Sequence, residues 1–175
     1  LAGTNWVFVT ADANNTVPET ADEGSNRQGI GALVVQALPP ADVAVTVVSG
    51  PDTTASGQGI TVSWSVQNVG AGATQATSWG ENVYLSADTL VDAGDHRLAT
   101  LTHGGALAAA GSYQAQATGT VPNGTSGTYR VLVRTELADA DTTNNVRAMP
   151  APLSVRLTPA PNLVPSGLAC AAQGT

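Results

Sequence analysis

Three aspartates with calcium-binding chemistry lie in the stretch YLSADTLVDAGDHRLATL, residues 84–101. Asp88, Asp92 and Asp95 follow one apolar segment and precede another. Calcium takes six to eight oxygen ligands, and several carboxylates in one loop commonly supply part of that set. One interpretation of this stretch is therefore a calcium site formed by Asp88, Asp92 and Asp95, with a further oxygen from Glu81 or Asn82.

The alternative interpretation is a solvated turn between two strands. The aspartates do not have the alternate spacing of an EF-hand loop, nor its glycine at the sixth position. In the tetrapeptide DAGD, residues 92–95, Asp92 can accept a hydrogen bond from its own backbone while Gly94 takes a positive φ. We favour the turn and keep calcium as the competing hypothesis.

A second acidic cluster occurs twice along the chain. The first copy contains Asp12, Glu19, Asp22 and Glu23, with Asn14, Asn15 and Asn26. The second contains Glu136, Asp139 and Asp141, with Asn144 and Asn145. Asparagine and aspartate side chains often bond nearby backbone groups at turns. We expect this structural role at the start of a strand rather than metal binding.

The sequence offers no recognisable catalytic constellation. His96 and His103 are the only histidines, and His96 follows Asp95. No serine in a nucleophile elbow, no Cys–His arrangement and no metal-ligating histidine spacing accompanies them. We therefore predict that the protein is not an enzyme, that it needs no cofactor, and that both histidines are exposed.

Composition limits the partners. The 175 residues include 13 Asp and Glu against 6 Arg, for a formal charge of −7, and no lysine. Nucleic acids and anionic membranes bind clustered positive charge, so neither is an expected partner. No apolar run approaches the roughly 20 residues of a membrane-spanning helix, and a single cysteine, Cys170, excludes an internal disulfide. Only 11% of residues are charged, which leaves a neutral polar surface of the kind common in secreted proteins.

Strand patterns dominate the chain. ITVSWSV, residues 60–66, alternates apolar and polar side chains with the period of a strand that buries one face. Further candidate strands are residues 42–48, 82–86, 97–102, 112–119, 128–135 and 152–157. Turn-forming Gly, Pro, Asn and Asp separate them. About seven short strands indicate an all-β fold, an immunoglobulin-like β-sandwich with Trp64 in its core. The other aromatic side chains are few, and we expect each of them to anchor a core: Trp6, Phe8, Tyr84, Tyr113 and Tyr129. The strand pattern does not decide whether Trp79 is buried.

The sequence repeats itself. GTNWVFV at 3–9 resembles GTYRVLV at 127–133, and PADVAV at 40–45 aligns with APNLVP at 160–165. Self-similarity at such a distance signals a modular array. We divide the chain into residues 1–38, the last strands of a preceding module; 41–160, one complete module; and 161–175, the first strand of a following module.

Incomplete modules at both ends expose unpaired strand edges, which attract further strands. Strand exchange between neighbouring copies would complete both ends and give a head-to-tail fibre. Self-association through the ends is therefore a hypothesis, beside completion by other modules of the same protein.

The motifs of residues 41–160 resemble a known family. The run SWGENVYLSAD followed by DAGD, with ELADADTTNN further on, is similar to CARDB, the cell-adhesion-related domain found in bacteria. The resemblance implies an immunoglobulin-like sandwich that occurs in tandem in large exported proteins, with no catalytic residues.

These observations together predict an extracellular structural or adhesive module at the cell surface, within a tandem-repeat protein or filament. Its expected partners are neighbouring modules, together with a surface glycan or protein ligand. The alternative is a carbohydrate- or calcium-binding accessory module of a secreted enzyme.

Overall fold

The computed structural model describes residues 2–18, 20, 23–159, 162, 164, 166 and 167. The chain divides into two compact units, residues 1–39 and 40–175. Cys170, Glu19 and Asp22 lie outside the described residues, as does most of the segment assigned to a following module.

The first unit is a β-hairpin. Strands β1 (Gly3–Thr10) and β2 (Arg27–Val35) pair antiparallel, with a bulge between Val7 and Phe8. A short 3-10 helix, η1 (Glu23–Asn26), precedes β2. In the connecting loop the Asp12 carboxylate accepts hydrogen bonds from the backbone N–H groups of Thr16 and Val17, at 2.8 Å each. These bonds favour the charged carboxylate and lower the pKa of Asp12.

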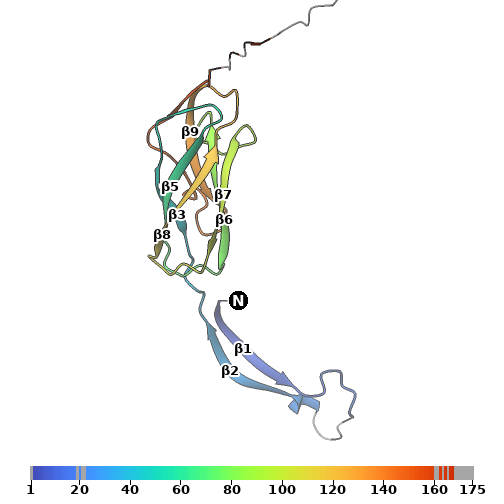
Figure 1. Cartoon of the computed structure of the whole chain (residues 1–175). Helices are drawn as coiled ribbons and strands as arrows, with labels where there is room; N and C mark the ends of the chain where they lie inside the picture. The colour runs from blue at the N-terminus through green and yellow to red at the C-terminus, as the bar shows by residue number, and fades with distance from the viewer. Residues whose placement is uncertain are drawn as a thin grey trace, which may run out of the picture. The chain divides into compact units, whose positions relative to one another are not determined.

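The second unit is a β-sandwich of two sheets (Figure 1). One sheet has the order β3-β5-β8 and contains β3 (Val43–Ser49), β5 (Gly59–Asn68) and β8 (Ser112–Thr120). The other has the order β4-β11-β9-β6-β7, with β10 also paired to β9. Its strands are β4 (Thr53–Ala55), β6 (Ser78–Ser86), β7 (His96–Gly104), β9 (Gly127–Thr135), β10 (Val146–Ala148) and β11 (Leu153–Arg156). The prediction of an all-β immunoglobulin-like sandwich is confirmed.

Alternation along the strands builds the core between the sheets. In β5, Val62, Trp64 and Val66 are buried while Thr61 lies on the solvent side. The facing sheet contributes apolar side chains to the same cluster, among them Val83, Leu85, Val131, Val133, Leu153 and Val155. Burying apolar surface on two facing sheets is the main stabilising term for such a fold.

Two predictions about aromatic side chains differ in outcome. Trp64 lies in the core, as predicted, and Trp79 is buried as well. Trp6 and Phe8, expected to anchor a core, are instead exposed, at 66% and 47% of their surface. Both belong to β1, and a two-stranded hairpin has no second layer to cover its side chains.

Side-chain hydrogen bonds tie the ends of the sandwich strands together. Asn68, at the end of β5, is fully buried and bonds only backbone groups. Its Oδ1 accepts from the N–H groups of Asp42 and Gly70, and its Nδ2 donates to the carbonyls of Gly72, Leu107 and Ala108. One side chain thus joins three segments that are far apart in sequence.

Candidate functional site

The three loop aspartates lie between β6 and β7, and each bonds the backbone of its own turn. Asp88 Oδ1 accepts from the Leu90 N–H at 2.8 Å. Asp92 Oδ1 accepts from the Gly94 N–H at 2.7 Å, and Asp95 Oδ2 accepts from the Asp92 N–H at 3.0 Å. These contacts are those of capped turns. The expected positive φ of Gly94 is wrong, because this glycine is not among the positive-φ residues of the described chain.

The expected extra ligands do not face this loop. Glu81 is fully buried within the sandwich, and Asn82 donates to Glu136 Oε1 at 2.8 Å while its Oδ1 accepts from Thr100. Within the described ranges, no three His, Cys, Asp or Glu side chains gather in a way that could hold a metal ion. The suggestion that Glu81 or Asn82 joins the aspartate loop is therefore wrong, and the geometry of the loop favours the capped turn.

Calcium titration separates the two interpretations of the loop. A ligand that binds only the folded protein stabilises it by an amount that grows with the logarithm of the ligand concentration above its Kd, and so raises its melting temperature. Because each carboxylate already accepts a backbone hydrogen bond, we expect millimolar calcium to leave the melting temperature unchanged in differential scanning calorimetry. A rise that a chelator reverses, and that Asp92→Asn abolishes, would instead establish a calcium site.

A buried polar cluster that was not predicted from the sequence lies inside the sandwich. Glu81 Oε2 accepts from Trp64 Nε1 at 2.9 Å, and Glu81 Oε1 accepts a hydrogen bond from the Tyr113 hydroxyl. Trp79 Nε1 donates to the same hydroxyl at 3.1 Å. A buried carboxyl group is costly unless its oxygens are hydrogen-bonded, and here both are.

His103 extends this cluster toward the surface. Its ring stacks on Tyr113 with the centroids 3.9 Å apart, and it lies 4.3 Å from Trp79. His103 is therefore half-buried, which corrects the expectation that both histidines are exposed, while His96 is exposed as predicted. The sequence contained a signal for Glu81: it shares the odd-numbered alternation of Trp79, Val83 and Leu85.

Burial raises the pKa of Tyr113 above its usual value, and the hydrogen bond to Glu81 raises it further. The unfolded chain ionises this phenol from about pH 10 upward, while the folded protein keeps it protonated. The stability that Tyr113 contributes is therefore complete below about pH 10 and is lost as the pH rises toward the folded-state pKa.

We expect Tyr113 to stay protonated in an alkaline absorbance titration until the protein unfolds. Tyr113→Phe should remove the ionisation step that coincides with unfolding. Ionisation of Tyr113 near pH 10 in the folded protein would contradict the buried hydrogen bond.

The second acidic cluster has the structural role that the sequence suggested. Asp139 Oδ2 accepts from the Val43 N–H at 2.6 Å, and Asn145 donates to the Leu137 carbonyl at 2.8 Å. Asn144 donates to Asp42 Oδ1 at 2.9 Å. Burial raises the pKa of Asp139, although the hydrogen bonds that it accepts from the Val43 N–H and from Asn145 Nδ2 lower it. The cluster holds the start of β3 against the segment after β9.

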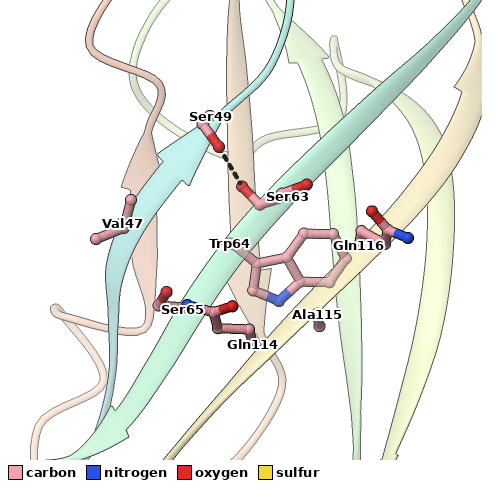
Figure 2. Close-up of a pocket in the computed structure, with 8 residues that line it drawn as sticks. All are labelled: Val47, Ser49, Ser63, Trp64, Ser65, Gln114, Ala115 and Gln116. Carbon is pink, nitrogen blue, oxygen red and sulfur yellow. Dashed lines mark hydrogen bonds between the residues drawn. The ribbon is translucent and has the colours of Figure 1, made fainter.

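A shallow depression lies over the sheet β3-β5-β8 (Figure 2). Its volume is about 450 Å³, and it is lined by Val47, Ser49, Ser63, Trp64, Ser65, Gln114, Ala115 and Gln116. Ser49 Oγ donates to the Ser63 carbonyl at its edge, at 3.4 Å. None of these side chains is titratable, and the Trp64 indole is buried. The depression therefore presents hydroxyl and amide groups rather than an acid, a base or a stacking platform.

The sandwich is similar to solved structures of low sequence identity. The crystal structure of the CARDB domain of a Pyrococcus furiosus protein, in complex with di-metal ions, is 20% identical; the match covers 67% of this chain and 89% of that one, with a TM-score of 0.47. A solution structure of the same domain is 17% identical over 66% of this chain and 95% of that chain, with a TM-score of 0.46. CARDB is the family that residues 41–160 resemble in sequence.

A β-glucosidase from Listeria innocua in complex with glucose also matches, at 16% identity and a TM-score of 0.45. That match covers 66% of this chain but 16% of the glucosidase. No protein-family model and no curated protein matches the sequence. In the part of the chain that the structure describes, no helix has the length and apolar character needed to cross a membrane.

Proposed function

We propose that this chain is an extracellular structural or adhesive segment of a tandem-repeat surface protein or filament. The observation that carries the proposal is the likeness between the hairpin and the closing strands of the sandwich. Both contain a strand of the GT-x-x-V-x-V pattern, followed by a polar loop and a returning strand.

The strand pairings of the two segments agree at both ends, although the returning segment 146–155 of the sandwich is one residue longer than 27–35 of the hairpin. In the hairpin, Asn5 lies opposite Leu33. At the aligned positions of the sandwich, Tyr129 lies opposite Leu153. Two residues earlier in each first strand, Gly3 lies opposite Val35 and Gly127 lies opposite Val155.

The same agreement holds at the other end of the pairing. Thr10 lies opposite Arg27 in the hairpin, and Arg134 lies opposite Val146 in the sandwich. The single strand β2 thus spans the positions of β10 and β11. This agreement supports a chain assembled from repeated modules.

A spacer role follows from the construction of the sandwich. At its strand ends, Asn68 and Asp139 accept hydrogen bonds from the backbone N–H groups of Asp42 and Val43. The link that precedes the sandwich contains Pro39 and Pro40. Proline restricts backbone rotation, so such a link limits bending between successive modules. A neutral, lysine-free surface suits an exported protein.

Electron microscopy of the native material tests this proposal. We expect fibres or rods with an axial repeat on the order of 40 Å, the length of a ten-residue strand and its flanking turns. Single globular particles without a repeat, in material extracted from the cell surface, would overturn it.

The depression on β3-β5-β8 supports a second candidate, a carbohydrate-binding accessory module. Hydroxyl and amide side chains are groups that fix the orientation of polar ligands. A glycan array tests this candidate: binding that Gln114→Ala and Gln116→Ala both weaken would support it. No binding, or binding unaffected by those changes, would exclude this surface.

A further inference from the structure

The hairpin carries an apolar face without a second layer. Val7 and Val9 alternate onto one face of β1. Leu33 and Val35 of β2 lie opposite Asn5 and Gly3, and therefore belong to the same face of the hairpin. Their exposed fractions are 39%, 56%, 52% and 37%. A two-stranded hairpin is at best marginally stable in water, and a face of this kind ordinarily packs against another layer.

The sandwich shows what covers such a face. Its residues at the aligned positions are Val131, Val133, Leu153 and Val155, with exposed fractions of 0%, 0%, 0% and 3%. All four belong to one core cluster with Val62, Trp64 and Val66 of the opposite sheet. In the sandwich, the sheet β3-β5-β8 therefore covers the face that corresponds to the apolar face of the hairpin.

The hairpin also has an edge to which a strand can be added. In the sandwich, β9 pairs with β10 and β11 on one edge and with β6 on the other. In the hairpin, β2 takes the place of β10 and β11, and no described strand pairs with the opposite edge of β1. In β6, Val83 lies opposite Val133 and Leu85 lies opposite Val131.

We propose that β1 and β2 close another sandwich of the same kind, whose strands equivalent to β3, β5, β6, β7 and β8 cover Val7, Val9, Leu33 and Val35. The β6-like strand adds to the free edge of β1, antiparallel, with apolar residues opposite Val9 and Val7. This inference rests on the proposed tandem architecture and names the partner that completes the hairpin.

A second copy of the chain does not fit this role. Residues 161–175 resemble only the beginning of β3 in sequence. The strands β5, β6 and β8 of a second copy are already paired within its own sheets. The partner is therefore a larger segment, of the length from β3 to β8, and a simple exchange of terminal strands between copies does not supply it.

The alignment specifies an experiment. Because Gly3 corresponds to Gly127, Leu1 corresponds to Thr125. A copy of residues 40–124 fused directly before Leu1 of the full chain would place the missing strands in register. In hydrogen–deuterium exchange, we expect protection of the peptide covering residues 3–10 to rise on the order of 10³-fold, because exchange then requires opening of a folded sandwich.

Two substitutions make the result specific. Val9→Asp in the extended chain puts a charge on the covered face and should abolish the added protection. Thr10→Asp, at the position of the half-exposed Arg134, should retain it. Unchanged exchange of residues 3–10 after the extension, or equal effects of the two substitutions, would overturn the proposal.

A second hybrid protein keeps the proposal testable if the extended chain fails to fold. Residues 1–39 replace residues 125–159 in the full chain, and we expect the hybrid to keep one cooperative unfolding transition. Loss of that transition overturns the proposal. Protection in the extended chain without fibres in the native material would refute the filament but not the closing role of the hairpin. Fibres in the native material, together with unchanged exchange of residues 3–10 in the extended chain, would refute only the closing role of the hairpin.

Discussion

Asn68→Ala is expected to lower the free energy of unfolding by about 4 kcal/mol, a large part of the stability of a typical domain. The side chain is fully buried and makes five hydrogen bonds, all to backbone groups. Each such bond contributes about 1 kcal/mol, and buried groups left without a partner add to the loss. Urea unfolding followed by tryptophan fluorescence measures the change.

Two further substitutions sharpen this test. Asn68→Asp keeps an oxygen for the N–H groups of Asp42 and Gly70 but cannot donate to three carbonyls. We expect a comparable loss at neutral pH and a smaller one at acidic pH, where the carboxyl is protonated and can donate. Asn123→Ala, on an exposed turn, should change stability by no more than about 0.5 kcal/mol. Equal effects of Asn68→Ala and Asn123→Ala would show that Asn68 does not hold the strand ends together.

Glu81→Ala is expected to cost about 3 to 5 kcal/mol in the same measurement. It removes the acceptor for both Trp64 Nε1 and the Tyr113 hydroxyl and leaves a cavity in a closely packed interior. The indole N–H of Trp64 can only donate a hydrogen bond, so it is left buried without an acceptor when Glu81 is removed. In an NMR spectrum the Trp64 indole resonance should shift strongly.

Glu81→Gln provides the comparison. A glutamine keeps one oxygen for Trp64 and can donate to the Tyr113 oxygen, so its cost should be clearly smaller than that of Glu81→Ala. Glu136→Gln serves as a control, because the glutamine keeps an oxygen for Asn82 Nδ2 and loses only the ion pair with Arg134. That pair, at 3.2 Å near the surface, contributes about 1 kcal/mol or less. If Glu81→Ala were as mild as the control, the cluster would not be important for stability.

The longer strands were predictable because their alternation is set by one buried face. Residues 60–66, 112–119 and 128–135 lie within strands of the structure. The strands β4 and β10 are three residues each, too short to show a period. Their positions depend on pairing with β11 and β9, which local sequence does not reveal.

The polar contents of the core were harder to predict. A glutamate in a strand is normally assigned to solvent, since burying a carboxyl group is costly. The partners that offset this cost, Trp64 and Tyr113, lie in other strands and meet Glu81 only after the sheets pack. The only sign in the sequence that Glu81 is buried is its position in the alternation of Trp79, Val83 and Leu85. For this residue, the alternation predicts burial better than the charged side chain predicts exposure. For the loop aspartates, by contrast, the local pattern DAGD was enough to predict capping by Asp92.

The pairing of β11 has a mechanical consequence. This strand, the last in the described part of the chain, lies between β9, antiparallel, and β4, parallel. The chain reaches the sandwich at one end and leaves it at the opposite end (Figure 1). Tension applied along the polypeptide would pull β11 lengthwise, so that its hydrogen bonds on both edges are sheared together instead of being peeled apart one by one. A strand held in this way resists pulling, a property suited to a load-bearing link in a chain of modules.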